Sequence, residues 1–585
     1  MKKNYKYLQI LLLIVSFLPA IFLGKLIIKY GVNVPFFDQW GVARYINKYF
    51  TSGLTFTDLL AQHNETRPFF PRIVFISLAS LTHWDVRYEM LVIFLMACFI
   101  SFNLYRLNRL TIGGMLFKVI LICLLFNLLI FSPVQYENWL WGFQIVIFIP
   151  MLCITSCILI AYSQLSSKGK FLTCMSLATI STFSLANGLL CWLVVFPVLA
   201  LNTWKDLSKE KWLVTGWIAG FTLNAALYFY GYQKPPHHPG IWDGAVHLQA
   251  AIDYFFGFCG SGFAFGNFNL AKNVGMVLFS IFIAVCIYLI KYRKNFILWH
   301  RTIGWLMIAT YSISSGLITT LGRVGFGVEQ SMAPRYTTFS LYLPISLVAL
   351  VAIIIDDAAR KSRFSNLKLL VYLISLIAII YLLFLELISV NMAVKEMNNW
   401  RVERLQGKSC LLFINIVKEE ECLATRVNPK IARVKFLANR LNSLGYLQPG
   451  LIKSSRIQNI EGSKVNTADG YGYGWFDGVS KVSNDEYVTS GWARLPDREE
   501  PADAVILTYE KANNHDTAFA LIYTRIKRED VAKVTPKDAY SMSGWQKSFS
   551  ASKLPKGQVK INAWAFDANT GKAFKLNGTQ IVQNL

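Results

Sequence analysis

The sequence predicts a polytopic α-helical membrane protein of about eleven transmembrane helices, followed by a soluble C-terminal region that ends in a β-sandwich-like domain. Of its 585 residues, 54% are hydrophobic and only 16% are charged, a balance that soluble proteins of this length rarely show. Apolar runs long enough to cross a bilayer recur along the first two thirds of the chain. From Lys395 onward the hydropathy falls and the charge rises.

The transmembrane helices are expected where apolar runs reach spanning length. The predicted spans cover residues 8–28, 90–105, 112–131, 143–162, 171–184, 188–202, 212–231, 272–290, 302–321, 338–355 and 369–391. Residues 171–202 could instead form one long helix, but that would place the later basic loops outside the cytoplasm. We therefore predict a tight hairpin at Asn187 and Gly188.

The orientation follows from the lysines and arginines, which are retained on the cytoplasmic side. Lys2, Lys3 and Lys6 place the N-terminus in the cytoplasm, and the even-numbered spans return to basic loops such as residues 291–294 and 360–363. An odd number of spans then places the C-terminal region in the periplasm of a bacterial inner membrane. We expect the first span to stay as an uncleaved anchor, because no small-x-small cleavage site follows it.

The net charge of +24 does not indicate a nucleic-acid partner, because the basic residues are spread over many loops without an aromatic-interleaved basic domain. Contacts with anionic membrane lipids explain them better. Most cysteines lie in or beside spans and suit apolar packing. Cys410 and Cys422 follow the last span, where an extracytoplasmic location makes a disulfide plausible; two unpaired thiols on one helix are the alternative.

Three domains are expected: a transmembrane domain over residues 1–393, a helical extracytoplasmic connector over 394–456 and a β-sandwich-like accessory domain over 457–585. The connector contains an amphipathic pattern that ends near Gly445. The last domain alternates short β-rich runs with turn clusters. Its tryptophans either stack on sugar rings or fill the core, and both interpretations remain open. They are Trp475, Trp492, Trp545 and Trp564.

Polar residues gather in the external loops, whereas the spans contain very few ionisable groups. A transporter of charged substrates generally needs such groups near the middle of the bilayer, so this distribution favours a site at the outer membrane surface. The first loop, residues 29–89, is the richest. The candidates are Asp38, His63, Glu65, Arg67 and Arg72 in the first loop, Glu137, Trp139 and Trp141 in the second, and Arg323 and Arg335 before the tenth span.

Two features of these loops suggest chemistry. Asp38 stands between Phe36, Phe37 and Trp40, and an acid partly removed from water among aromatic side chains suits a general base. Arg323 and Arg335 lie in a glycine-punctuated loop, and guanidinium groups bind phosphate in a bidentate manner.

Together these groups would suit a sugar linked to a lipid phosphate. The carboxylate would take a proton from an acceptor hydroxyl, and that oxygen would displace the phosphate at the anomeric carbon and invert its configuration. Arginine would stabilise the departing phosphate electrostatically, in place of a general acid. The tryptophans would offer aromatic platforms, although Trp139 and Trp141 are equally typical of membrane-interface anchors.

Four stretches in the same order strengthen this hypothesis. FFDQWG, AQHNETRPFFPR, QYENWLWGFQ and GRVGFGVEQSMAPRYTTFS are similar to stretches of the GT-C class of integral membrane glycosyltransferases. The chain resembles bacterial members that use polyprenyl-phosphate-linked sugars, including the O-antigen glucosyltransferases of serotype conversion. The resemblance implies transfer of a hexose, glucose above all, to a cell-surface glycan such as O-antigen.

The resemblance also assigns roles to residues. It implies Asp38 as the catalytic base, with Glu65 as second candidate. The donor phosphate would bind Arg323, Arg335 and Arg72, and the substrates would contact His63, Arg67, Glu137, Trp139 and Trp141. We expect no cofactor. The chain lacks the paired acids of the metal-dependent branch, which leaves a requirement for a divalent metal open.

Three alternatives remain. A lipid-linked oligosaccharide flippase or other transporter would depend on residues inside the spans. An O-antigen polymerase or ligase would take a whole oligosaccharide from a polyprenyl pyrophosphate. A surface glycan receptor would depend on the C-terminal sandwich.

Overall fold

The chain divides into two compact units in its computed structural model. The model describes residues 2–584 except 113–115, 204–205, 207–208, 237–238, 241–245, 362–364, 464, 466, 468, 484, 512–514 and 536–537. The helical unit comprises Met1–Gly31, Leu54–Phe75 and Tyr88–Asn398, and the C-terminal unit comprises Val32–Gly53, Ile76–Arg87 and Asn399–Leu585. These limits differ from the sequence-based domains, because two segments of the first loop belong to the C-terminal unit.

In the described part of the chain, eight helical segments are long and apolar enough to cross a membrane. They are built on α5 (Arg87–Thr111), α6 (Leu116–Ile130), α8 (Ile145–Ala161), α12 (Trp212–Phe229), α15 (Phe268–Lys291), α16 (Phe296–Arg323), α17 (Pro334–Lys361) and α18 (Ser365–Leu412). The other three predicted spans correspond to α1 (Lys2–Tyr30), α9 (Ser167–Thr182) and α10 (Leu190–Asn202). The predicted polytopic helical architecture is therefore confirmed.

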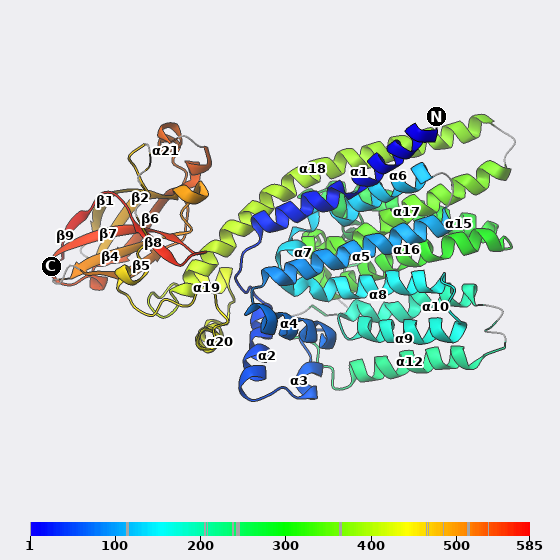
Figure 1. Ribbon diagram of the computed structural model, residues 1–585, viewed down its shortest axis with the longest axis horizontal. Helices are drawn as coiled ribbons and strands as arrows, with labels where there is room; N and C mark the ends of the chain where they lie inside the picture. The colour runs from blue at the N-terminus through cyan, green and yellow to red at the C-terminus, as the bar shows by residue number, and fades with distance from the viewer. Residues whose placement is uncertain are drawn as a thin grey trace. The chain divides into compact units, whose positions relative to one another are not determined.

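The apolar character of these helices has two causes. Helix α8 is buried along most of its length, so it is apolar on every side. Helix α12 instead exposes Ile218, Leu223 and Leu227, each more than half accessible, as expected for side chains that meet lipid. Helices α8, α9, α10 and α12 pack as neighbours in the helical unit (Figure 1).

The predicted break between α9 and α10 is confirmed. A short 3₁₀ turn, η3 (Ala186–Leu189), separates the two helices, and the Ser181 hydroxyl donates a hydrogen bond to the Gly188 carbonyl at 3.0 Å. A Cβ atom on Gly188 would lie 1.8 Å from the carbonyl oxygen of Ser181. The two backbones therefore approach so closely that a glycine is required.

Three charged side chains near helix ends of the helical unit form one group. Lys118 of α6 contacts Asp356 of α17 at 2.8 Å, and Arg301 of α16 lies 3.6 Å from the same carboxylate. Arg301 also donates to the carbonyls of Thr111 and Ile112 at 2.6 and 2.8 Å. These contacts join three helices through one acid and offset the cost of removing its charge from water.

The helices of the C-terminal unit come from two parts of the chain, the first loop and the residues after the last span. The last part of α18 is followed by α19 (Glu420–Arg426) and α20 (Ile431–Ser443). Helix α20 has the predicted amphipathic character, with Val434, Leu437 and Leu441 buried. It packs against α2 (Gln39–Thr51), which belongs to the first loop.

The rest of this unit consists of two antiparallel sheets. The first contains β1 (Gly474–Ser483), β2 (Glu486–Leu495), β3 (Glu500–Pro501) and β6 (Gly544–Ser550), and the second contains β4 (Ala504–Lys511), β5 (His515–Ile522), β7 (Gly557–Asp567), β8 (Lys572–Lys575) and β9 (Gln580–Asn584). Side chains of both sheets share one hydrophobic core, which includes Phe476, Trp545, Leu507 and Ile561. This is the arrangement of a β-sandwich.

The tryptophans of the sandwich separate into two groups. Trp492, Trp545 and Trp564 are 4%, 2% and 1% exposed, so they fill the interior. Trp475 of β1 is 42% exposed. The hypothesis that these side chains stack on sugar rings is therefore wrong for the three buried ones.

The close approach at Gly188 gives a testable consequence. We expect Gly188→Ala to lower the free energy of unfolding by about 1–3 kcal/mol, because the added methyl group forces the two backbones apart. Thermal unfolding of the purified protein in detergent measures this change. Gly216→Ala in α12 is the matched control, since nothing lies within 4 Å of a Cβ at that position. Equal melting temperatures for both variants would contradict the prediction.

Candidate functional site

Asp38 lies at the N-terminus of α2 in the C-terminal unit, where it is half-buried. The preceding residue, Phe37, has a φ of 45°, which is uncommon for a bulky side chain. Its backbone N–H donates to the Val427 carbonyl at 2.8 Å, and its carbonyl accepts from the Asn428 side chain at 2.9 Å. The backbone that carries Asp38 is therefore held in a strained conformation by residues nearly four hundred positions away.

The aromatic neighbours of Asp38 have separate roles. The Arg404 guanidinium lies over the ring of Phe36, 3.5 Å from its centroid, and 4.8 Å from the centroid of Trp400. Trp40 is 1% exposed and donates its Nε1 hydrogen to the Pro35 carbonyl at 3.1 Å. Trp40 is thus part of the scaffold of the loop. Arg404 is a neighbour of Phe36 that the sequence pattern did not reveal.

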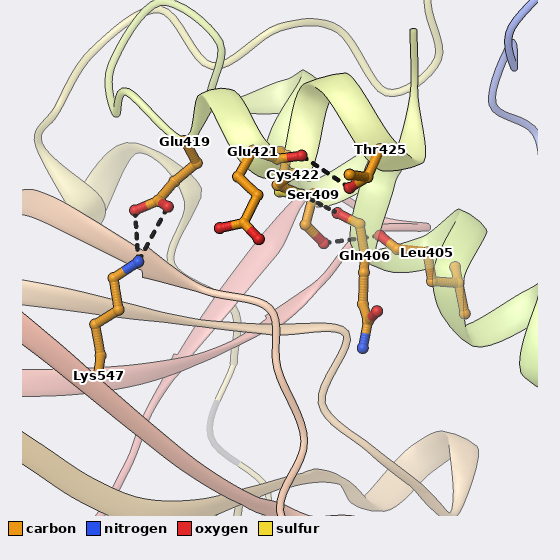
Figure 2. Close-up of a disulfide and its surroundings, with 9 residues drawn as sticks. Leu405, Gln406, Ser409, Glu419, Glu421, Cys422, Thr425 and Lys547 are labelled. Carbon is orange, nitrogen blue, oxygen red and sulfur yellow. Dashed lines mark hydrogen bonds and ion pairs between the residues drawn. A yellow bond between two sulfur atoms is a disulfide. The ribbon is translucent and has the colours of Figure 1, made fainter. Parts of the chain in front are cut away.

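Cys410 at the end of α18 and Cys422 in α19 form the disulfide suggested by the sequence, with their Cα atoms 6.3 Å apart (Figure 2). Near it, Lys547 of β6 contacts Glu419 at 3.0 Å. The disulfide closes the turn that leads through α19 to Asn428. It therefore constrains the segment that holds the backbone of Phe37.

In the helical unit, Arg335 is held at the start of α17 by the second loop. Its guanidinium lies 3.3 Å from the carboxylate of Glu137 in α7 (Tyr136–Leu140). Asn138 donates to the Arg335 carbonyl at 3.2 Å and to the Thr338 hydroxyl at 2.6 Å. The Thr338 hydroxyl in turn donates to Gln135 at 2.5 Å. The QYEN stretch therefore forms a polar support for Arg335.

Arg323 occupies the last turn of α16 and forms an ion pair with Glu65. The Tyr228 hydroxyl fixes the backbone of Glu65 through a hydrogen bond of 2.7 Å to its carbonyl. In this structure Glu65, the second candidate for the base, is thus the counter-ion of a proposed phosphate ligand. Arg323 and Arg335, the two arginines proposed to bind the donor phosphate, are called the arginine clamp. Each has a carboxylate partner that orients its guanidinium group.

Tyr254 is a further candidate that sequence reasoning missed. It belongs to α14 (Leu248–Gly260), is 0% exposed, and its hydroxyl has no hydrogen-bond partner among the described residues. Burial raises the pKa of this phenol, while the nearby charges of Arg323 and Arg335 act in the opposite direction. Tyr254 therefore stays a protonated donor at neutral pH, within electrostatic range of both arginines. Nothing in its local sequence distinguishes it from a core tyrosine.

Three predicted ligand contacts have structural roles instead. Arg72 is 2% exposed, and its Nη1 donates to the carbonyls of Leu59 and Ala61 at 2.6 Å each, which caps the end of α3 (Phe56–Leu60). We therefore leave Arg72 out of the phosphate clamp.

Arg67 and Trp139 are likewise engaged with the backbone. The Nε of Arg67 donates to the Tyr228 carbonyl at 2.7 Å, and its Nη1 donates to the Leu60 carbonyl at 3.1 Å. Trp139 is 0% exposed and its Nε1 donates to the Ser132 carbonyl at 2.9 Å. Trp139 is therefore a buried part of the scaffold, and the half-buried Arg67 joins the first loop to the end of α12.

His63 and Trp141 are brought to one aromatic cluster. Their rings lie 5.4 and 5.9 Å from that of Phe143, which stacks on Phe75 at 5.9 Å. Both side chains are half-buried. They remain candidates for contact with a sugar or with the lipid chain.

Metal ligation has no geometric support in the described residues, where no three His, Cys, Asp or Glu side chains form a group that could hold an ion.

Comparisons with known proteins give one structural likeness. No protein-family model matches the chain, and no curated protein matches it. The chain is similar to the crystal structure of ArnT from Cupriavidus metallidurans bound to undecaprenyl phosphate, with 14% sequence identity, 76% of each chain covered and a TM-score of 0.35. A likeness of this degree carries no argument about the chemistry of the present chain.

The hydrogen bonds that hold the backbone of Phe37 predict that Asn428→Ala loosens the loop around Asp38. One hydrogen bond to a strained residue is lost, so amide hydrogen exchange in a peptide covering residues 36–41 should accelerate about tenfold. Mass spectrometry of the full-length protein measures this rate. Asn439→Ala is the control, because Asn439 pairs with Asn415 at the surface of α20. Unchanged exchange in Asn428→Ala would mean that the Val427 carbonyl is sufficient.

Proposed function

We propose that this chain is a membrane glycosyltransferase that moves a hexose from a polyprenyl-phosphate-linked sugar to a cell-surface glycan such as O-antigen. The observation that supports it best is the pair Arg323 and Arg335. Each lies at the end of an apolar helix, each is oriented by a carboxylate, and both act electrostatically on the buried Tyr254 hydroxyl.

This arrangement suits a lipid phosphate. Each guanidinium is a planar group with five N–H donors, a geometry that matches phosphate oxygens. The Tyr254 hydroxyl adds a neutral donor. Because Glu65 and Glu137 lower the net charge of the group, the clamp binds a phosphate without presenting two bare cations to the membrane before the donor arrives.

Asp38 is the proposed base. Its carboxylate takes the proton of an acceptor hydroxyl, a new bond forms between that oxygen and the anomeric carbon, and the bond from that carbon to the phosphate oxygen breaks. Polyprenyl phosphate leaves as the anion held by arginine. Glu65 forms an ion pair with Arg323, so we assign Glu65 to the phosphate-binding group and keep Asp38 as the base.

One observation favours transport as a second candidate function. Glu386 of α18 is 4% exposed and lies within a candidate membrane span, where ionisable residues often mark a pathway. A flippase for lipid-linked oligosaccharides would depend on Glu386 rather than on Asp38. The structure offers no comparable observation for an O-antigen polymerase or ligase.

The base assignment predicts that Asp38→Asn lowers kcat by about 100-fold or more with little change in the KM of the donor, since general-base catalysis supplies a factor of this order. Transfer by purified protein from a defined polyprenyl-phosphate hexose to an isolated glycan measures both constants. Glu65→Gln is the comparison variant. Full transfer by Asp38→Asn would refute the assignment, and loss of function on Glu386→Gln instead would favour the transporter.

The clamp assignment predicts that Arg335→Ala raises the KM of the donor by about tenfold or more, because charge-assisted hydrogen bonds to the phosphate are lost. The single change also leaves Glu137 without its cation. The double variant Arg335→Ala, Glu137→Gln also removes the unpaired carboxylate and should bind the donor as weakly as the single variant. Arg293→Ala, an exposed site, is the control. Wild-type donor affinity in the double variant would remove Arg335 from the clamp.

A further inference from the structure

We propose that the C-terminal unit holds a second anion-binding subsite, separate from the arginine clamp, which receives a carboxylate or phosphate group of the acceptor glycan. It is a small pocket with a volume of about 20 Å³ that opens to solvent, enough for the oxygens of one acidic group. Its lining comes from four separate stretches of this unit. The polar and aromatic members are Asn33, Trp84, Lys408, Tyr446 and Gln448.

Lys408 is the reason to expect an anion. It is only 5% exposed, yet it forms no hydrogen bond or ion pair with any other described residue. Lysines are rarely buried to this degree unless they are paired, because a charge removed from water needs a compensating partner. A ligand that carries a negative charge would supply that partner.

The charged groups around Lys408 do not fill this role. Asp85, Asp503 and Asp567 attract it and Arg87 repels it, all through space. Asp85 is bound to Arg87 at 2.6 Å. Both other acids lie 2.7 Å from a different cation, Arg498. Each of these carboxylates is thus paired with an arginine, and none of them forms an ion pair with the Lys408 ammonium group.

The remaining lining supplies further donors for an acidic group. Asn33 accepts the Val86 N–H at 3.2 Å, and its amide NH₂ group and that of Gln448 are donors. Trp84 is 2% exposed and Tyr446 is 8% exposed, so the aromatic side chains form closed walls of the pocket. The pocket therefore suits the carboxylate or phosphate group itself, with the rest of the glycan outside it.

Strain marks the same place. His83 and Trp84 are consecutive residues with φ of 52° and 55°, a conformation that bulky side chains rarely adopt and that costs free energy at each residue. Strained residues of this kind cluster at ligand sites.

The pocket shares its scaffold with the loop of Asp38. Residues 33–35 line the pocket and directly precede Phe36. Trp40 donates to the Pro35 carbonyl and packs edge-on against Trp84, with centroids 6.3 Å apart. A group bound in the pocket would thus contact the same residues that position the proposed base. The base acts on the acceptor, so we assign the bound group to the acceptor. That assignment rests on the proposed function, whereas anion binding itself does not.

Binding is tested without catalysis, on the full-length protein in detergent. Sodium glucuronate and inorganic phosphate are the probes, and glucose is the neutral comparison. Both anions should raise the melting temperature of the wild type, because a ligand that binds the native state stabilises it. Lys408→Met should abolish this shift and, without anion, should melt at or above the wild-type temperature, since it removes an unpaired buried charge. Lys453→Met, at an exposed site, should behave as the wild type.

Equal anion shifts in the wild type and in Lys408→Met would mean an adventitious ion only, and a lower melting temperature of Lys408→Met without anion would mean a structural lysine. Either result overturns the subsite.

The source of the anion is tested by transfer assays. Lys408→Met should raise the KM of an acceptor that contains a uronic acid by about tenfold and leave that of its carboxyl-reduced form unchanged. A raised KM for the donor instead would overturn the acceptor assignment. If neither the wild type nor any variant transfers sugar, the proposed function fails. The subsite stands in that case if the anion-induced shift in melting temperature still depends on Lys408.

Discussion

Compensation of buried charge is the constraint on which this structure depends. Within apolar helices a guanidinium or carboxylate cannot be left without a partner. Arg323 and Arg335 meet this requirement with Glu65 and Glu137, and Arg72 meets it with backbone carbonyls. The partners of these arginines differ: Arg72 is bound to carbonyls and closes a helix end, whereas Arg323 and Arg335 are bound to carboxylates.

The same constraint explains why the second loop has its particular sequence. Glu137 neutralises Arg335, and Asn138 and Gln135 hold the first turn of α17 through Thr338. Trp139, the next residue along the chain, is buried and donates to the Ser132 carbonyl. The loop is therefore a rigid support for one arginine, and its aromatic residues are mostly a part of that support.

The loop of Asp38 depends on a different interaction, in which hydrogen bonds from a distant segment hold a strained backbone. Phe37 is kept in a left-handed conformation by Val427 and Asn428, on a segment that the Cys410–Cys422 disulfide constrains. This gives the C-terminal unit a part in positioning the proposed base, beyond that of an accessory sandwich. Lys408 in the same unit is buried and forms no ion pair with another described residue, and exceptions of this kind to charge compensation are expected where a ligand completes the environment.

The sequence by itself determined the elements whose signal is local. Spanning helices follow from apolar length, the break at Gly188 from the need for alternating basic loops, and the strands of the sandwich from period-two patterns between turns. The sequence also identified Asp38, Arg323 and Arg335 as residues of interest, because an acid among aromatic residues and arginines among glycines are unusual in external loops.

Only the tertiary structure decided which of the polar residues are available for a ligand. Arg72 and Arg67 differ from Arg335 in their partners, and partners distant in the chain leave no trace in a local pattern. Tyr254 and Lys408 look like ordinary helix residues in the sequence. Burial sets both apart, and the Tyr254 hydroxyl has no hydrogen-bond partner among the described residues. The physical reason is that the cost of burying a polar group depends on its surroundings in space, and these are set by long-range packing rather than by neighbours in sequence.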